Sequence, residues 1–240
     1  MKKKLAIFAI LLISGLSSIA QVLENLISFK KGTVLIYEIE ENNQKYPLTI
    51  TIESTKPDLV FNYNQEGALK RNGIVTINGK TLVNSGKLIF DFRQPKLNLT
   101  DATCLFINRD FNDKIESIAT QIYWEKKESA DTMTIPLKLE NIAAPVIFGQ
   151  ISREVEDLKV NGKLRQFHTN SISNVKDSKG KEIEIGTSYM FRISKDIEFP
   201  VVTYANMIKY TMVLVEIKNA QWLKMNFATN EYEKVDDIED

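Results

Sequence analysis

Alternation of apolar and polar residues with a period of two is the feature that most constrains this fold. In residues 48–53, Leu48, Ile50 and Ile52 alternate with polar residues, so a strand would turn all three to one face. Further runs rich in β-branched and aromatic residues lie at 33–40, 59–63, 74–77, 80–83, 88–92, 121–124, 132–139, 158–167, 171–175, 182–185, 188–193, 201–204 and 210–217. The sequence predicts a mainly β protein with a large curved antiparallel sheet, either a half-barrel or a sandwich.

Two kinds of local signal refine this expectation. The runs 34–39 and 210–215 are apolar on both faces, which predicts strands covered on both sides. Asn-Gly pairs at 78–79 and 161–162 predict type I′ hairpin turns, because both residues tolerate a positive φ. The repeated turn is compatible with two similar halves, about 30–100 and 120–220, although Asn-Gly turns are common enough for coincidence to be the simpler explanation.

One stretch has helical periodicity instead. Its apolar residues recur at intervals of three and four, at Cys104, Ile107, Phe111, Ile115 and Ile118. This spacing predicts a helix over 101–118, capped by Thr100 or Asp101. Residues 140–156 fit either a loop or a short helix. Residues 231–240 contain six acids and one lysine, which predicts a disordered, solvated tail.

The first twenty residues have the pattern of a cleaved export signal. Lys2, Lys3 and Lys4 precede an apolar run over 5–13, and Ser18 and Ala20 are small residues at the positions that a signal peptidase reads. We therefore expect cleavage after Ala20 by the general secretory route, which leaves residues 21–230 as a single β-rich domain. An uncleaved anchor is the alternative, but the apolar run is shorter than the roughly 20 residues that span a bilayer. No later segment is longer, so no integral membrane segment is expected in the mature chain, and we expect a bacterial periplasmic or secreted protein.

Removal of this leader changes the charge of the chain. The 240 residues contain 31 basic and 31 acidic side chains, and the leader holds three lysines but no acid. The mature chain therefore has 28 basic against 31 acidic residues and a charge of about −3. This balance argues against a nucleic-acid partner, which needs a basic surface to neutralise phosphates.

The sequence offers no catalytic, cofactor-binding or metal-binding constellation. His168 is the only histidine and is expected to face solvent on a strand. Cys104 is the only cysteine, and its place on an apolar stripe favours a buried, inert thiol over a nucleophile. Glu38, Glu40 and Glu53 are interpreted as solubilising charges. A carbohydrate-directed enzyme with two carboxylates is kept as an alternative, because sequence alone cannot show whether two acids face each other.

Aromatic residues on the predicted strands are the remaining lead. In a sandwich they would be core residues, whereas in a half-barrel some would line an apolar pocket. The candidates for this pocket are Phe61, Tyr63, Phe90, Phe92, Tyr123, Trp124, Phe167, Tyr189 and Phe191.

The chain resembles the uncharacterised exported β-rich domains of Gram-negative bacteria. The stretch that suggests it is Thr100-Asp101-Ala102-Thr103-Cys104-Leu105-Phe106-Ile107-Asn108-Arg109. The resemblance implies a half-barrel or sandwich in which a short helix interrupts two antiparallel halves, and some exported half-barrels, such as lipoprotein carriers, bind acyl chains. The expected function is a non-enzymatic binding protein for an apolar ligand, such as a lipid, or for an envelope protein. A structural or assembly protein that pairs through a sheet edge is the alternative.

Overall fold

The computed structural model describes residues 25–67, 70–124, 130–139, 146–177, 190–194, 197–206 and 210–235. The predicted export signal, the run at 182–185 and the last five residues lie outside these ranges. In chain order the strands and helices are β1 (Asn25–Ser28), β2 (Val34–Glu41), β3 (Gln44–Ser54), β4 (Leu59–Gln65), β5 (Arg71–Ile77), α2 (Gly79–Val83), β6 (Lys87–Leu88), β7 (Lys96–Leu99), α3 (Arg109–Trp124), β8 (Ala130–Leu139), β9 (Val146–Val160), β10 (Lys163–Asp177), β11 (Met190–Ser194), β12 (Val202–Asn206), β13 (Thr211–Lys218), β14 (Gln221–Asn226) and β15 (Glu231–Val235).

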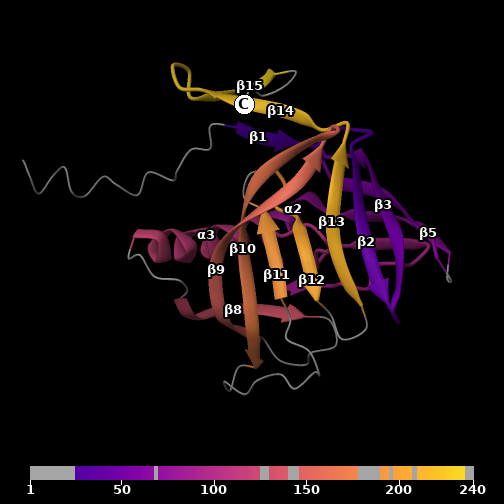
Figure 1. The fold of residues 1–240 in the computed structure, drawn as a ribbon, viewed down its shortest axis with the longest axis horizontal. Helices are drawn as coiled ribbons and strands as arrows, with labels where there is room; N and C mark the ends of the chain where they lie inside the picture. The colour runs from indigo at the N-terminus through magenta and orange to yellow at the C-terminus, as the bar shows by residue number, and fades with distance from the viewer. Residues whose placement is uncertain are drawn as a thin grey trace, which may run out of the picture.

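The predicted mainly β fold with a large curved sheet is confirmed (Figure 1). The described strands form a twelve-stranded sheet in the order β6-β8-β9-β10-β11-β12-β13-β2-β3-β4-β5-β7, and a three-stranded sheet in the order β1-β14-β15. We call the second one the small sheet. Most pairings are antiparallel, as expected, but β5–β7, β6–β8 and β9–β13 are parallel.

Strands β2 to β4 follow the predicted alternation. In β3, Leu48, Ile50 and Ile52 are fully buried, while the residues between them are partly exposed. The expectation that β2 and β13 are covered on both faces is wrong, because only one face of each strand is buried. On the other face of β13, Val215 is 43% exposed. The large sheet thus has one apolar face and one mixed face, which is usual for antiparallel sheets.

The two Asn-Gly pairs adopt different structures. Asn161 and Gly162 both have positive φ and join β9 to β10, so the predicted hairpin is confirmed there. At 78–79 the prediction is wrong, because the Asn78 side chain caps α2 by accepting a hydrogen bond from the Lys80 amide. A Cβ on Gly79 would lie 2.2 Å from the Pro57 carbonyl oxygen, so this glycine is needed for close backbone packing. The repeated dipeptide therefore gives no support to two similar halves.

The predicted helix is displaced toward the C-terminus. Helix α3 begins at Arg109, after Asn108, whose side-chain oxygen accepts a hydrogen bond of 2.9 Å from the Phe111 amide. The predicted caps at Thr100 and Asp101 are therefore wrong, and Cys104 and Ile107 precede the helix. Residues 121–124, predicted as a strand, form its last turn. The ambiguous region 140–156 is also settled in part, since residues 146–156 belong to β9.

Residues 85–108, which we call the inner segment, supply the outer strands β6 and β7 of the large sheet, and Phe92 and Phe106 of this segment pack against the apolar face of β4. Residues 102–108 of this segment are all buried. They bond to other parts of the chain: the Ile107 amide donates to Pro200 and the Val202 amide donates to Leu105. Phe106 contacts Phe61 of β4, with ring centroids 5.6 Å apart. These contacts explain why residues 102–107 are not helical despite their periodicity.

The small sheet joins the two ends of the described chain. Strand β1 pairs with β14, and β14 pairs with β15, so the first described strand lies beside the last two (Figure 1). Trp222 of β14 stacks on Phe167 of β10 at 6.4 Å and connects the small sheet to the large one. The predicted disordered tail is therefore wrong for residues 231–235, which form β15; residues 236–240 lie outside the described residues.

Candidate functional site

The aromatic residues proposed to line a pocket are core residues wherever the structure describes their side chains. Five of them are 0–4% exposed, namely Phe61, Tyr63, Phe90, Phe92 and Phe167. Phe92 packs edge-on against Phe61 and Tyr63, at 6.0 and 5.7 Å. The side chains of Tyr123, Trp124 and Phe191, and all of Tyr189, lie outside the described atoms. Phe61 and Tyr63 pack against Phe92 of the inner segment, and Phe167 packs against Trp222 of the small sheet, so protein side chains occupy the places that an apolar ligand would need there.

The lone histidine lies on a strand and is exposed, as predicted, whereas the lone cysteine is buried as predicted but precedes the helix on which it was expected. His168 is exposed on β10, directly opposite Val155 of β9. Cys104 is fully buried within the inner segment. Among the described residues, no three histidine, cysteine or acidic side chains are grouped closely enough to hold a metal ion. His168 is therefore a surface residue of β10, and Cys104 is part of the core.

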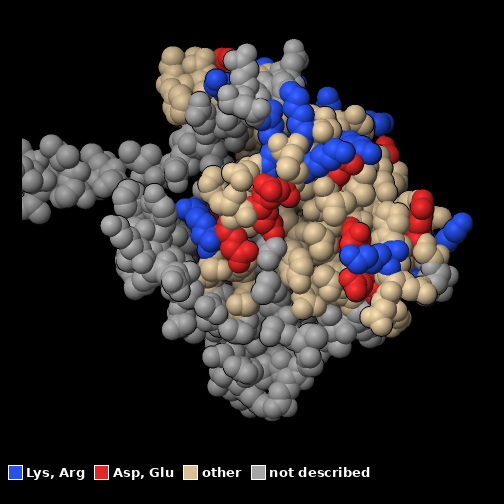
Figure 2. All heavy atoms as spheres, in the orientation of Figure 1, with Lys and Arg blue, Asp and Glu red and all other residues tan. Residues whose placement is uncertain are grey.

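The surface acids identified in the sequence belong to ion pairs and polar contacts on strands. Lys45 lies 2.7 Å from a carboxylate oxygen of Glu38 and 3.9 Å from one of Glu40. Asn62 donates a hydrogen bond of 2.8 Å to Glu53. Figure 2 shows acidic and basic side chains interspersed over this face of the molecule, as expected for solvated charges.

Two other carboxylates come nearer to a paired arrangement. Glu154 and Glu156 lie two residues apart on β9 and therefore share one face of the strand. Ser171 of β10 donates a hydrogen bond of 2.6 Å to Glu154, and Thr203 of β12 donates one of 2.9 Å to Glu156. Since both acids extend from the same strand, they do not face each other across a cleft as glycosidase carboxylates do. Their hydrogen bonds link β9 to its neighbour β10 and to the more distant strand β12.

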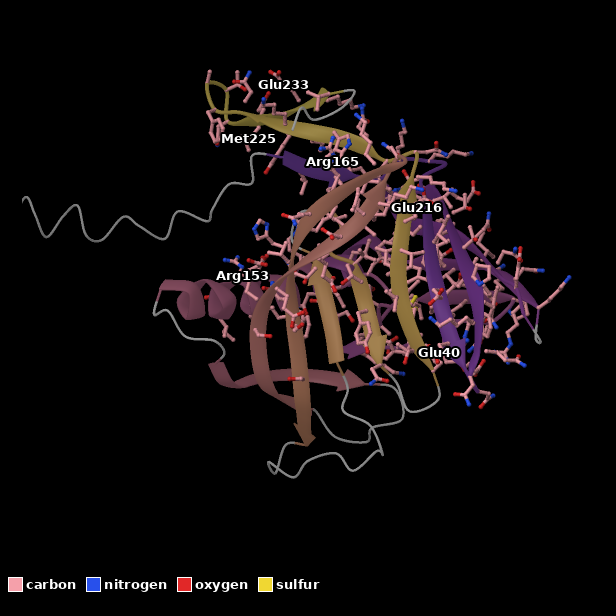
Figure 3. The ribbon with its side chains drawn as sticks, in the orientation of Figure 1. Glu40, Arg153, Arg165, Glu216, Met225 and Glu233 are labelled. Carbon is pink, nitrogen blue, oxygen red and sulfur yellow. The ribbon has the colours of Figure 1, made fainter. Side chains whose placement is uncertain are left out.

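The opposite face of β9 and β10 holds helix α3. Arg153 of β9 lies 3.4 Å from Glu116 of α3, and Figure 3 shows it beside that helix. Asn170 of β10 donates a hydrogen bond of 2.5 Å to the same carboxylate. Because Glu116 receives both a cation and an amide, it attaches the helix to the β9–β10 hairpin.

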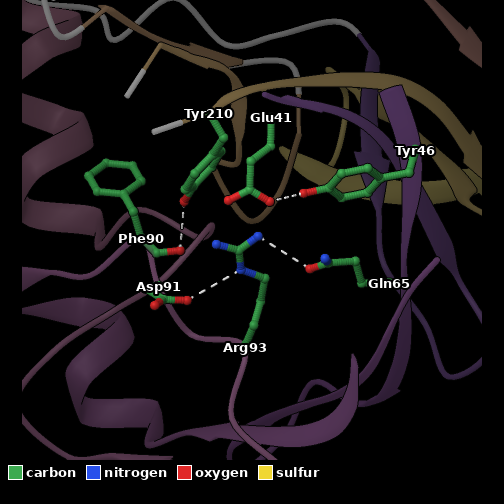
Figure 4. Close-up of polar contacts among 7 residues, drawn as sticks. All are labelled: Glu41, Tyr46, Gln65, Phe90, Asp91, Arg93 and Tyr210. Atoms are coloured by element: carbon green, nitrogen blue, oxygen red, sulfur yellow. Dashed lines mark hydrogen bonds and ion pairs between the residues drawn. The ribbon is translucent and has the colours of Figure 1, made fainter. Parts of the chain in front are cut away.

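A second polar network surrounds Arg93 of the inner segment (Figure 4). The Arg93 side chain is only 7% exposed, and its Nε lies 3.3 Å from Asp91. It also donates a hydrogen bond of 3.2 Å to Gln65 at the end of β4, and its guanidinium carbon lies 4.7 Å from the Tyr210 ring centroid. Tyr210 in turn donates a hydrogen bond of 3.0 Å to the carbonyl of Phe90. The network fastens the inner segment to β4 and to the residue before β13.

Tyr46 of β3 lies in the same region and donates a hydrogen bond to Glu41. Burial, followed in size by this hydrogen bond and the Glu41 charge, raises the pKa of Tyr46 to about 12. The phenol is therefore protonated at neutral pH and serves as a donor. Arg93 contacts Asp91, Gln65 and Tyr210. These residues therefore hold the inner segment against the strands beside it, and we call this arrangement the clamp.

The small sheet provides a different kind of surface. Ile27 and Trp222 lie directly opposite each other and are buried against the large sheet. Strand alternation places Leu26, Leu223 and Met225 on the other face, where Met225 is directly opposite Tyr232 of β15. Figure 3 shows Met225 and Glu233 at this end of the molecule. The small sheet thus carries apolar side chains on both faces.

The turn between β14 and β15 displays an aromatic residue. The Asn230 amide donates a hydrogen bond of 2.8 Å to the Asn226 carbonyl, and the Asn226 side chain accepts one of 3.0 Å from the Ala228 amide. Asn230 has a positive φ, which suits asparagine at the end of such a turn. Phe227 lies between these bonded residues and is 69% exposed, so an internally bonded turn presents a large apolar side chain to solvent.

Sequence reasoning missed the small sheet and Phe227. The signal available was the short run with Trp222, Leu223 and Met225, followed by the turn residue Asn230, but the acidic composition of 231–240 obscured it. Neither helix in the described part of the chain is long and apolar enough to cross a lipid bilayer.

Comparison of the chain with protein-family models, with curated proteins and with solved structures finds no match to any of them.

Proposed function

We propose that this chain is an exported, non-enzymatic binding protein that docks on another protein of the cell envelope through its small sheet. The observation that carries the proposal is Phe227, which is 69% exposed at the tip of the β14–β15 turn. A large aromatic side chain held in a hydrogen-bonded turn loses little conformational entropy on binding, and such residues commonly contribute most of the energy of an interface.

The same region favours a protein partner over a lipid surface. Glu231 and Glu233 follow the turn and are exposed. Anionic headgroups would repel these carboxylates, whereas a protein pocket with a basic rim would attract them. A buried lipid ligand is less well supported, because the described aromatic candidates for its pocket are buried core residues.

A site-specific photo-cross-linker in place of Phe227 tests the docking surface in the cells that make the protein. We expect a discrete adduct with another protein, with a lower yield when Ala228→Arg is added beside it. The matched control carries the same cross-linker in place of Val83, an apolar residue of α2 that is 45% exposed. Equal yields at the two positions, or no adduct at position 227, would overturn the proposal.

Export is tested separately by cell fractionation and intact-mass measurement. The leader predicts a mature chain that begins at Gln21 and is recovered outside the cytoplasm. A full-length chain in the cytoplasmic fraction would contradict export and leave the docking surface to be judged by cross-linking.

A further inference from the structure

Strand β15 lies at the edge of the small sheet and has a distinctive charge pattern. It is the outermost strand in the order β1-β14-β15, and its partner on the inner side is β14 over Glu231 to Val235. The side chains of Glu231 to Lys234 are exposed. An edge strand offers backbone N–H and C=O groups that can pair with one further strand.

The two faces of β15 differ in chemistry. Glu231 and Glu233 are two residues apart and project to one face, while Tyr232 and Lys234 project to the other. Asn226 at the end of β14 donates a hydrogen bond of 2.6 Å to Glu233 on the neighbouring β15. Residues of an added strand would lie directly beside these side chains, about 5 Å away. Basic side chains are therefore favoured next to the two glutamates, and apolar ones next to Tyr232.

The same pattern disfavours pairing with a second copy of β15. An antiparallel two-fold pairing centred on Glu233 would place the two Glu233 side chains opposite each other. A pairing centred on Tyr232 would place Glu231 opposite Glu233 twice. Like charges directly opposite each other destabilise a strand pair, so the charges of β15 select a different sequence.

We propose that β15 binds an extended segment of the partner protein as a fourth strand of the small sheet, and that this segment alternates basic and apolar residues. The inference rests on the proposed docking function and specifies how the partner is recognised. Backbone hydrogen bonds to β15 supply affinity, and the basic residues beside Glu231 and Glu233 supply specificity and register.

Fluorescence anisotropy with labelled peptides tests this mode on the mature chain, residues 21–240. The probe is a seven-residue peptide of alternating lysine and valine, and the comparison peptide alternates glutamate and valine. We expect the basic peptide to bind at least about tenfold more tightly at low salt, with a smaller difference at high salt. The double variant Glu231→Lys, Glu233→Lys should reverse the preference.

The matched control is Glu38→Lys, Glu40→Lys, which makes the same charge change at the same spacing on β2. It should keep the preference for the basic peptide. A basic peptide methylated on alternate backbone nitrogens should lose binding, and amide hydrogen exchange at Tyr232 and Lys234 should slow only with the unmethylated peptide. Equal binding of methylated and unmethylated peptides, or a reversal caused by the β2 control, would overturn strand addition.

The two proposals can fail separately. Cross-linking at position 227 without any binding of the basic peptide would retain the docking surface and remove strand addition. Peptide binding without a cross-linked partner would retain strand addition by β15 as a property of the chain and remove the proposed envelope function. Circular dichroism of each variant establishes that it is folded before either result is read.

Discussion

The inner segment and the turn between β14 and β15 each carry a phenylalanine, but the two side chains have opposite exposure. Phe106 of the inner segment is fully buried, with aromatic rings of β4 and of residue 29 around it. Phe227 of the hairpin is 69% exposed in a turn held by its own hydrogen bonds. Phe106 therefore contributes to the core, whereas Phe227 stays in solvent even though Trp222 of the same hairpin is buried. This difference separates residues kept for stability from residues available for contact.

The largest effect is expected from emptying the core at Phe106. Truncation to alanine removes the ring that packs against Phe61 and Phe29 and leaves a cavity. Phe106→Ala should lower the free energy of unfolding by about 3–5 kcal/mol, measured by urea denaturation. A loss below about 1 kcal/mol would mean that the inner segment is not part of the cooperative core.

The second-largest effect is expected from alkaline pH, which should lower the free energy of unfolding by ionising buried phenols such as that of Tyr46. The pKa of Tyr46 is raised by burial and by Glu41 from its ordinary value of 10.0 to about 12, and burial also raises that of Tyr37. A raised pKa means that the folded state holds the proton more tightly. The stabilisation is complete below pH 10 and is lost as the pH rises toward 12, by roughly 2–3 kcal/mol for Tyr46.

Tyr46→Phe should therefore flatten the dependence of unfolding free energy on pH above pH 10, when it is measured in urea at fixed ionic strength. Tyr37→Phe is the matched variant, because it removes another buried phenol, which donates to the Val202 carbonyl at 3.0 Å. Each variant should remove only part of the alkaline loss. Identical profiles for both variants and the parent chain would contradict the assignment.

Loss of the Arg93 guanidinium should have an intermediate effect. Arg93→Met keeps much of the side-chain volume but removes the contacts with Asp91, Gln65 and the Tyr210 ring. We expect a loss of about 1–3 kcal/mol by urea denaturation, since a largely buried donor is removed from its polar acceptors. Arg93→Lys should recover only part of it, because an ammonium cannot reproduce the planar fork. Full recovery by lysine would show that charge alone matters.

A smaller effect is expected where two turns meet. The Asn161 side chain donates a hydrogen bond of 2.9 Å to the Ala220 carbonyl and accepts one of 3.1 Å from its amide. Asn161→Gly preserves the positive φ but loses both bonds, and should cost about 1–2 kcal/mol in thermal or urea unfolding. Asn43→Gly, at another exposed turn position with positive φ, is the control and should cost less.

The smallest change in stability is expected at Phe227 in the turn between β14 and β15. Phe227→Ser should alter the free energy of unfolding by less than about 0.5 kcal/mol, because the ring is mostly solvated in the isolated protein. The same variant should remove docking to the partner. A loss of several kcal/mol would show that Phe227 is a packing residue and would weaken its role as a contact.

Strand content was predictable because the signal is local. In β3, alternation at Leu48, Ile50 and Ile52 identifies both the strand and its buried face. The predicted helix starts too early in the sequence. Residues 102–107 have helical periodicity, but their backbone bonds to residues near Pro200 and Val202 instead. Such distant partners override local periodicity and leave no mark in the sequence nearby.

The same limit applies to the functional residues. Phe61 and Phe227 are both aromatic residues in β-rich surroundings, and only the packing of segments far apart in sequence decides which is buried. The two Asn-Gly pairs make the same point: one forms a hairpin, whereas the other begins a helix that Asn78 caps and that packs beside the backbone at Pro57. Residues 231–235 were predicted as a disordered tail from their acidic composition. Composition carries no information about the pairing with β14 that orders them.

The pairing of β1 with β14 also sets an order of events. Asn25 pairs with Lys224, so β1 can find its partner only after all the strands between β1 and β14 have been synthesised. Closing so long a loop is entropically costly and follows the formation of local hairpins such as β2–β3. If the chain is exported unfolded, as proposed, the small sheet would be completed only after delivery, and the proposed docking surface would be complete only there.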